Sequence, residues 1–260
     1  IALEALKNAQ ATAPLPRMQS DISEFNRVTG GGLVPGSATL IGGDPGIGKS
    51  TLLLQLSCNL SKRGFRAAYI SGEESADQVR MRADRLGLAN AEVELGTATN
   101  ASDIAATMTG PDRPDIVVID SIQTMFWPNL DSAPGTVSQV RASAQELIRA
   151  AKNNRVALLI VGHVTKDGAI AGPRVLEHMV DCVLHFEGDR SHHFRILRGV
   201  KNRFGATDEI GVFEMVEAGL AEVPNPSELF LADRRDDVTG AVGGVAAACA
   251  STRPSSWNPV

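Results

Sequence analysis

The chain has 260 residues, of which 43% are hydrophobic and 21% charged, and a formal net charge of −5 at pH 7. This length and composition allow one full α/β domain with a modest appendage and exclude a chain that is disordered throughout. The negative total excludes a protein that coats nucleic acid or membrane by bulk electrostatics, so any nucleic-acid site must be a local basic patch.

The sequence gives no indication of a membrane or of an oxidising compartment. Three cysteines, Cys58, Cys182 and Cys249, lie far apart without the paired spacing of a zinc site, which is typical of buried thiols in a reducing cytoplasm. The most apolar tail stretch, 238–250, is too short and too rich in Gly and Ala to span a bilayer. The first residue is Ile1 and nothing near it resembles a signal peptide, so we expect a soluble cytoplasmic fragment that lacks its natural N-terminus.

The middle of the chain alternates strand-like and helix-like patterns. Residues 1–17 show little periodicity and suit a linker, or a short helix followed by a loop. From Ile22 onward, apolar runs at 38–41, 67–70, 116–119 and 156–161 alternate with candidate helices at about 50–63, 75–86, 101–109 and 136–153. This alternation predicts an α/β fold with a mostly parallel sheet covered by helices on both faces.

The pattern changes after Gly168. Strand-like segments at 182–187, 194–199 and 209–215 are joined by short polar turns, so we expect antiparallel strands that extend the sheet. The prolines at 224 and 226 predict a boundary beyond Gly219, and the remaining residues are too few for an independent domain.

A phosphate-binding loop is the strongest single motif. Residues 43–50 read Gly-Asp-Pro-Gly-Ile-Gly-Lys-Ser and lie between a strand-like run and a helix-like run, the flanks that such a loop needs. Its glycines let the backbone approach phosphate, Lys49 reaches the β- and γ-phosphates, and the Ser50 hydroxyl can bind Mg²⁺. The predicted nucleotide-binding residues are Gly43, Asp44, Pro45, Gly46, Ile47, Gly48, Lys49, Ser50 and Thr51.

Carboxylates close two other predicted strands. Asp120 ends the run Ile116-Val-Val-Ile, a Walker B pattern that suits a Mg²⁺ site shared with Ser50; an ordinary Asp turn is the alternative. Glu73 and Glu74 follow the strand at 67–70, at the edge where open α/β sheets bind ligands. We predict that Glu73 activates water, while either acid would also serve as a helix N-terminal residue.

Two further features of the sequence each allow two interpretations. His163 follows the strand at 156–161, where it would sense a γ-phosphate or be an ordinary hydrogen-bonded polar group. The segment from Arg195 to Arg203 holds four basic residues and no acid. It is either a solvated basic hairpin or an arginine-finger arrangement in which Lys201 and Arg203 reach a neighbouring subunit's triphosphate.

Taken together, these motifs resemble the bacterial RadA (Sms) recombination and repair ATPases of the RecA/DnaB-like class. The matching segments, in order, are 30–36 (GGGLVPG), 42–51 (GGDPGIGKST), 71–75 (SGEES), 118–123 (VIDSIQ) and 201–205 (KNRFG). The last segment is the one most specific to that family. The resemblance covers about residues 18–235.

The resemblance implies a RecA-like P-loop NTPase core and a hexameric, DNA-dependent ATPase. ATP with Mg²⁺ would lie between subunits, and single-stranded DNA would pass through the ring during branch migration of recombination intermediates, with the RecA recombinase as a partner. In the site, Lys49, Ser50 and Asp120 would handle phosphate and Mg²⁺, Glu73 would activate water, and Lys201 and Arg203 would act catalytically across the interface. Candidate DNA-contacting loops are about 124–141, with Trp127 and Arg141, and about 165–174, with Lys166 and Arg174.

It also implies a domain organisation and leaves one alternative. We expect an N-terminal extension at 1–17, the ATPase domain at 18–218, and a linker with the truncated start of a Lon-protease-like domain at 219–260. The four-cysteine zinc module that usually begins such chains is not in this sequence. The alternative is a nucleotide-gated signalling ATPase similar to KaiC, which the segment 201–205 disfavours.

Overall fold

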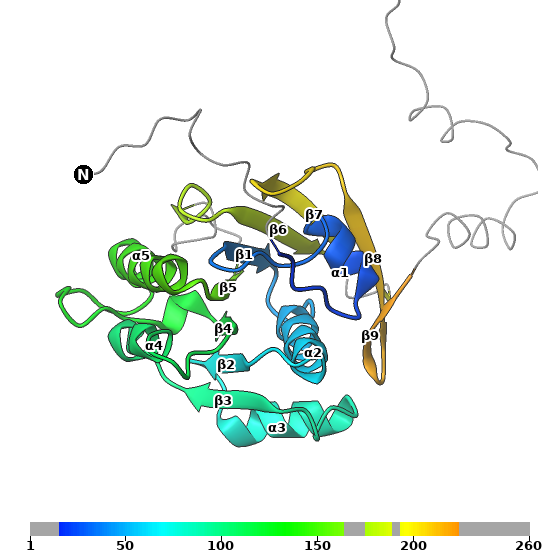
Figure 1. Cartoon of the computed structure of the whole chain (residues 1–260), viewed down its shortest axis with the longest axis horizontal. Helices are drawn as coiled ribbons and strands as arrows, with labels where there is room; N and C mark the ends of the chain where they lie inside the picture. Colours follow the sequence, from blue (N-terminus) through cyan, green and yellow to red (C-terminus); the bar gives the residue numbers. More distant parts are fainter. Residues whose placement is uncertain (1–15, 164–174, 189–192, 224–260) are drawn as a thin grey trace, which may run out of the picture. The chain divides into compact units, whose positions relative to one another are not determined.

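A nine-stranded sheet organises the computed structural model, which describes residues 16–163, 175–188 and 193–223 (Figure 1). The strand order is β3-β2-β4-β5-β1-β6-β7-β8-β9. The strands are β1 (Ala38–Gly43), β2 (Ala67–Ser71), β3 (Val93–Thr97), β4 (Ile116–Asp120), β5 (Ala157–His163), β6 (Cys182–Glu187), β7 (Phe194–Asn202), β8 (Ile210–Val216) and β9 (Gly219–Glu222). The helices are α1 (Ser23–Val28), α2 (Lys49–Lys62), α3 (Ala76–Arg85), α4 (Ala101–Thr107) and α5 (Val137–Asn154), with the 3-10 turn η2 (Ile122–Thr124).

The predicted fold class is confirmed, with one correction in the second half of the sheet. Strands β3, β2, β4, β5 and β1 are parallel neighbours, and β7, β8 and β9 add antiparallel pairs. We predicted β6 as part of an antiparallel meander, but it pairs parallel with β1 and antiparallel only with β7. The short polar turn after β6 predicts only that β6 pairs with β7. The pairing of β6 with β1 joins segments far apart in the sequence, so no local sequence pattern predicts it.

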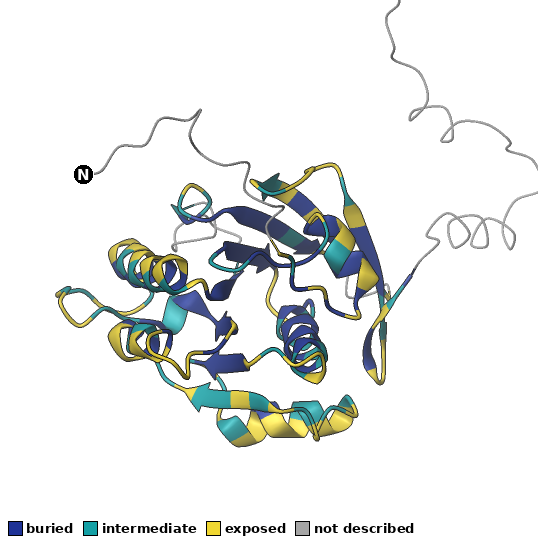
Figure 2. Ribbon diagram, viewed as in Figure 1, coloured by how far each residue is buried: buried dark blue, intermediate teal, exposed yellow. Residues whose placement is uncertain are grey.

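The helices cover both faces of the sheet and create two separate cores. On one face, α1, α2 and α3 pack on sheet residues such as Ile41, Tyr69 and Val118. On the other, α4 and α5 pack on the alternate residues, including Leu40 and Val117. All positions of β1, β2 and β4 are buried, as expected for strands sandwiched between helices (Figure 2).

Besides the 3-10 turn η2, three elements were not predicted from the sequence. β3 is a half-exposed edge strand containing Gly96, so it lacks a continuous apolar run. α1 has only six residues, too short for a clear helical period. β9 follows a tight turn after β8 and is fixed to α2, because the Gln55 side chain donates to Leu220 O and accepts from Leu220 N.

β9 lies beyond residue 218, the domain end expected from the sequence. It pairs with β8, and the Glu222 carboxylate accepts hydrogen bonds from Ser23 Oγ and Glu24 N at the start of α1. The compact unit that contains the described residues ends at Pro224. Of the N-terminal extension expected at 1–17, only 16 and 17 are described, and of the linker and Lon-like segment expected at 219–260, only 219–223 are described. Within the described ranges, no helix combines the length and apolarity needed to cross a membrane.

Candidate nucleotide site

The phosphate loop joins the central strand β1 to the N-terminus of α2. Gly48, the residue before the helix, has φ of 114°, a conformation that favours glycine, and it supplies no side-chain cap. Helices α3, α4 and α5 each have a side-chain cap, from Ser75, Asn100 and Thr136. The first N–H groups of α2 therefore have no side-chain acceptor at the N-cap, which leaves them available to a phosphate.

The phosphate loop is anchored to the hydrophobic core through Ile47. The Ile47 side chain is 2% exposed and packs in the core that contains Phe186. Gly43 is needed at its position, since a Cβ there would lie 2.3 Å from Phe186 O. Asp44, Pro45 and Gly46 are exposed at the top of the loop. Of the predicted nucleotide-binding residues, Ile47 therefore offers only its backbone.

Lys49 lies inside the loop that precedes it. Its Nζ donates to the carbonyl oxygens of Gly43 at 2.7 Å and Asp44 at 2.8 Å, and the residue is 3% exposed. Burial lowers the pKa of Lys49 to about 8, while the negative charges of Asp120, Asp44 and Glu73 act in the opposite direction. An incoming phosphate would add negative charge at the same place and favour the charged ammonium.

Asp120 ends β4 at the same edge of the sheet. β5 lies between β4 and β1, so the Walker B strand is one strand removed from the phosphate loop. Asp120 is buried and accepts a hydrogen bond from the Tyr69 hydroxyl on neighbouring β2. Burial, together with the Asp120 charge, raises the pKa of Tyr69 well above its usual value, which keeps the hydroxyl protonated as a donor to the carboxylate.

Three strand ends meet at Glu73. Its Oε1 accepts a hydrogen bond from Ser121 Oγ, after β4, and lies 3.2 Å from Nε2 of His163, at the end of β5. Gln123 Nε2 in turn donates to His163 O at 3.3 Å. The Nδ1 of His163 is buried and has no hydrogen-bond partner among the described residues. The carboxylate of Glu73 is thus held at the edge where the phosphate loop opens.

Glu74 points elsewhere, although it is adjacent in sequence. Its Oε1 pairs with Arg82 of α3, and its backbone N–H donates to Ser71 Oγ. The helix start is capped by Ser75 and Gln78, which form a reciprocal capping box. Local capping is therefore provided by Ser75, and only Glu73 shares the edge of the sheet with Asp120 and His163.

The residues at this edge fit a nucleotide-bound Mg²⁺. Such an ion needs only one or two protein ligands, because substrate phosphates and water supply the others. The described residues contain no group of three or more His, Cys, Asp or Glu that could form a full protein cage. The hydroxyl of Ser50, on the first turn of α2, and the carboxyl oxygens of Asp120 are ligands of the required kind.

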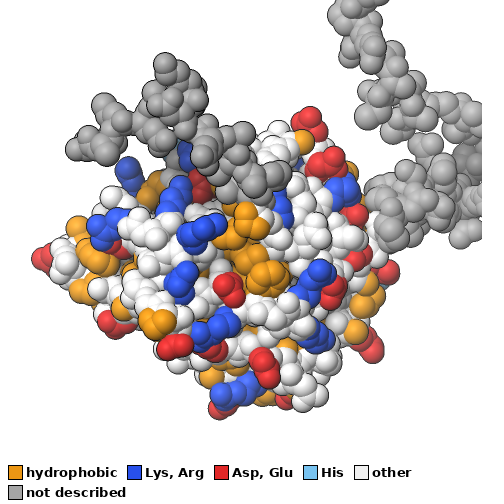
Figure 3. Space-filling view, viewed as in Figure 1, with side chains coloured by type: hydrophobic (Ala, Val, Ile, Leu, Met, Phe, Trp, Pro, Cys, Tyr) orange, Lys and Arg blue, Asp and Glu red, His pale blue; other side chains and the backbone are white. Residues whose placement is uncertain are grey.

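The four basic residues of the segment 195–203 do not form one solvated hairpin. Arg195 is 6% exposed and its Nε donates to Ile47 O at 3.2 Å, inside the phosphate loop. Arg198 is exposed, 3.7 Å from Glu187. On the view in Figure 3, Lys and Arg side chains lie among acidic and uncharged ones, so no uniform basic surface covers that face.

The phosphate loop follows the end of β1, whereas Lys201 and Arg203 lie level with the start of β1, at the opposite end of the parallel strands. Asn202 pairs with Cys182 at the start of β6, which itself lies beside Thr39 near the start of β1. Arg203 is thus level with Ala38 and about 16 Å of strand away from Gly43, at roughly 3.3 Å per residue. The structure does not bring Lys201 or Arg203 to the phosphate loop of the same chain.

Both residues are held by the segment that precedes β6. Lys201 Nζ donates to Glu177 O at 2.7 Å and Val180 O at 2.8 Å. Arg203 pairs at 2.9 Å with the buried Asp181, which also accepts from Lys152 Nζ and Ala38 N. Burial alone would raise the pKa of Asp181, but these hydrogen bonds outweigh it and hold that pKa below its usual value.

Of the two loops expected to contact DNA, only 124–141 lies among the described residues. Residues 165–174 lie outside the described residues. In 124–141, the buried Gln139 fixes the loop: its side chain accepts from Trp127 N at 2.7 Å and donates to Leu130 O and Ser132 O. Trp127 packs partly against the core beside α5, and Arg141 is exposed on that helix.

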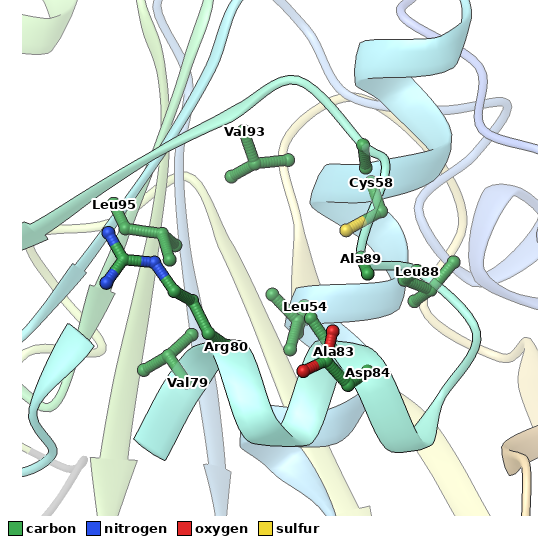
Figure 4. A pocket seen from close by; sticks show the side chains of 11 residues that line it. Leu54, Cys58, Val79, Arg80, Ala83, Asp84, Leu88, Ala89, Val93 and Leu95 are labelled. Carbon is green, nitrogen blue, oxygen red and sulfur yellow. The ribbon is translucent and has the colours of Figure 1, made fainter. Parts of the chain in front are cut away.

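A separate pocket of about 330 Å³, lined by both apolar and charged side chains, lies between α2, α3 and β3. Figure 4 shows Leu54, Val79 and Val93 around it, with Arg80 and Asp84 on the α3 side. Cys58 also lines it, and burial raises the pKa of that thiol to about 11, so the thiol is protonated and unreactive at neutral pH. No phosphate-loop residue lines this pocket.

Four site residues were missed by sequence reasoning: Tyr69, Ser121, Gln123 and Arg195. Ser121 and Gln123 follow the predicted Walker B acid within three residues, so the strand-end position was an available signal. Tyr69 lies two residues before the end of β2, inside an apolar run where its hydroxyl gave no pattern. Arg195 looked like one member of a surface charge cluster, since its burial depends on long-range packing.

The fold and the site define a RecA-like P-loop NTPase domain, and this fold implies nucleotide binding. A family model described as "AAA domain" matches residues 9–169, more than half of the chain. The chain therefore belongs to this AAA domain family.

Curated relatives confirm the resemblance to RadA that the motifs predicted. A protein named "DNA repair protein RadA" from Brucella abortus (strain 2308) is 62% identical over 243 residues, covering 92% of this chain and 52% of the relative. A protein of the same name from Streptococcus pneumoniae (strain ATCC BAA-255 / R6) is 54% identical over 250 residues, covering 96% of this chain and 59% of the relative. The chain spans about half the length of these relatives.

Solved structures agree on the fold. One solved ATPase domain has a TM-score of 0.66 at 14% identity and covers 82% of this chain, with 93% of that chain matched. The RadB recombinase has a TM-score of 0.60 at 20% identity and covers 79% of this chain, with 99% of that chain matched. These likenesses concern the fold alone.

Proposed function

We propose that this chain is the ATPase core of a DNA-dependent motor in homologous recombination and DNA repair. The observation that carries the proposal is the meeting of Glu73, Ser121 and His163 at the edge where the phosphate loop opens. A loop that only held nucleotide would not need a carboxylate positioned there. The relatives named DNA repair protein RadA support the biological setting.

In this proposal, Glu73 is the general base that polarises the attacking water. Ser121 donates to Glu73 Oε1 and His163 lies next to the same oxygen, so the carboxylate has a fixed orientation. His163 would report the state of the γ-phosphate to the chain after β5. Glu74 takes no part, because its carboxylate pairs with Arg82.

Phosphate is held by the backbone N–H groups of the loop and by Lys49, which exchanges its two carbonyl partners for phosphate oxygens. Ser50 and Asp120 would hold Mg²⁺, which neutralises charge on the phosphates when bound. The Tyr69 hydroxyl donates to the Asp120 carboxylate, and in this proposal it holds that carboxylate in place for the ion.

The site is completed by a neighbouring subunit. Lys201 and Arg203 lie at the end of the strands away from the phosphate loop, so they cannot stabilise charge on a nucleotide bound to the same chain. From a neighbour they would reach the triphosphate as trans fingers, which requires a head-to-tail oligomer, by resemblance a hexameric ring. Single-stranded DNA and recombination intermediates would contact the loops 124–141 and 165–174, and RecA would be a partner.

The test is ATP turnover with and without single-stranded DNA at low salt, where phosphate contacts are strongest. We expect turnover that rises with DNA and is lost in Lys49→Ala. A chain that binds no nucleotide, or that hydrolyses ATP equally well with Lys49→Ala, would refute the proposal. Turnover that DNA leaves unchanged would refute the motor part alone.

A further inference from the structure

We propose that Arg195 is a positioning residue that sets the phosphate loop for binding. The inference rests on the proposed nucleotide site and deepens it. Arg195 lies on β7, two strands away from β1 across β6, and its side chain reaches under the loop. It is 6% exposed, and its Nε donates to the carbonyl oxygen of Ile47 at 3.2 Å.

The hydrogen bond to Ile47 fixes one peptide plane of the loop. The Ile47–Gly48 peptide is trans, and the C=O and N–H of a trans peptide point in opposite directions. Because Arg195 holds the carbonyl of Ile47 on the protein side, the N–H of Gly48 must face the other way, toward the opening of the loop. Gly48 immediately precedes α2, so this N–H joins those at the uncapped helix start.

The surroundings fix the guanidinium itself. Its Nη1 donates to Phe194 O at 2.9 Å, which ties the side chain back to its own strand. Gly188 leaves room for it, since a Cβ at that position would lie 2.7 Å from Arg195 Cδ. The Ile47 side chain is buried on the same side of the loop. The loop is thus held by an apolar anchor and by a charged donor at the same residue.

This role differs from that of the other basic residues on β7. Arg198 is on the opposite face of the strand and exposed, and Lys201 lies near the far end of the strand. β7 therefore carries both a residue that orients the phosphate loop of its own chain and Lys201, which is proposed to reach the next subunit's nucleotide. Arg195 acts through the loop backbone and is not itself a catalytic residue.

The experiment measures binding of ADP and of inorganic pyrophosphate to wild type, Arg195→Met, Arg195→Lys and the exposed control Arg198→Met. Pyrophosphate carries only the part of the ligand that the loop N–H groups contact. We expect Arg195→Met to weaken both ligands by about tenfold or more, the scale of one charge-assisted hydrogen bond. Arg195→Lys, which keeps one charged donor, should recover part of the loss, and Arg198→Met should bind like wild type.

A second variant and a second measurement distinguish a specific effect on the phosphate loop from a general loss of folding. Gly188→Ala keeps Arg195 but places a Cβ 2.7 Å from its Cδ and 2.9 Å from Phe194 O, so it shifts this side chain and the start of β7, and should weaken pyrophosphate in the same direction. Amide hydrogen exchange in 43–51 should speed up in Arg195→Met while β4 and β5 keep wild-type protection. Wild-type affinity for pyrophosphate in both Arg195→Met and Gly188→Ala would overturn the inference. Absence of ADP binding to wild type would instead overturn the nucleotide site on which it rests.

Discussion

Glu73 and His163 are 90 residues apart in the sequence, yet Glu73 Oε1 lies 3.2 Å from His163 Nε2. The contact follows from the strand order, because β2, β4 and β5 are successive neighbours and all end at the same edge. Ser121 completes the group from the strand between them. The catalytic carboxylate of the proposed site is therefore oriented by two strands other than its own.

The first prediction compares the two adjacent acids. Glu73→Gln should keep ATP binding but lower kcat by about 10²-fold or more, the usual contribution of a positioned general base. Glu74→Gln, the matched control, removes only the half-buried pair with Arg82 and should keep kcat within about threefold. Single-turnover hydrolysis with bound ATP measures both. A larger fall in Glu74→Gln than in Glu73→Gln would reverse the assignment.

The second prediction concerns Gly72, which connects β2 to Glu73. A Cβ at this position would lie 2.0 Å from Thr124 Oγ1 and 2.9 Å from Met125 Cε. Gly72→Ala should therefore destabilise the fold by about 1–3 kcal/mol, which lowers Tm by several degrees. Gly96→Ala on β3 is the control, since its Cβ would meet only Ile70 Cγ1 at 3.6 Å. Equal melting temperatures for the two variants would contradict the predicted clash.

The third prediction is a pH dependence of nucleotide binding. Lys49 has a pKa of about 8 in the folded chain. A bound polyphosphate stabilises the ammonium and raises this pKa, so binding above pH 8 takes up a proton. Affinity for ADP should then fall with rising pH, by up to about tenfold per unit. Burial keeps the pKa of Cys58 at about 11 and that of Cys182 at about 12, so these thiols do not titrate in this window.

Calorimetry at pH 9 in two buffers of different ionisation enthalpy measures the proton uptake directly. Lys49→Arg, whose guanidinium keeps its charge, should show a flatter dependence. The lowered pKa of Lys49 also affects the stability of the chain without ligand, and this stability changes with pH in the direction opposite to the affinity for ADP. Between pH 8 and 10.5 the unfolded state holds more protons at Lys49, so this group makes the fold more stable as pH rises. Binding of ADP without proton uptake at pH 9 would contradict the prediction.

The sequence predicted local features well and long-range ones poorly. The phosphate loop, the Walker B acid and the paired glutamates are each a continuous motif at a strand end, so they could be placed from the pattern of apolar runs. The sequence favoured Glu73 over Glu74 as the base, and this choice stays a prediction; the contacts that distinguish the two acids, with Ser121 and Arg82, depend on packing that the sequence does not reveal. The burial of Arg195 and the parallel pairing of β6 depend on contacts between distant segments.

In the proposed oligomer, one chain supplies the phosphate loop and its neighbour supplies Lys201 and Arg203. The direct test mixes two variants at a concentration where sedimentation shows that the chain self-associates. One is Lys201→Ala with Arg203→Ala, and the other is Lys49→Ala. Asp181 keeps Lys152 and Ala38 N as partners in the first variant, and its Tm serves as the folding control.

Each variant alone should have almost no ATPase activity. The mixture should regain a measurable fraction of wild-type turnover, because an intact loop then meets intact fingers at some interfaces, and single-stranded DNA should increase it. If the finger variant alone hydrolyses ATP at the wild-type rate, or if mixing restores nothing in assembled oligomers, the account of a site shared between subunits is wrong.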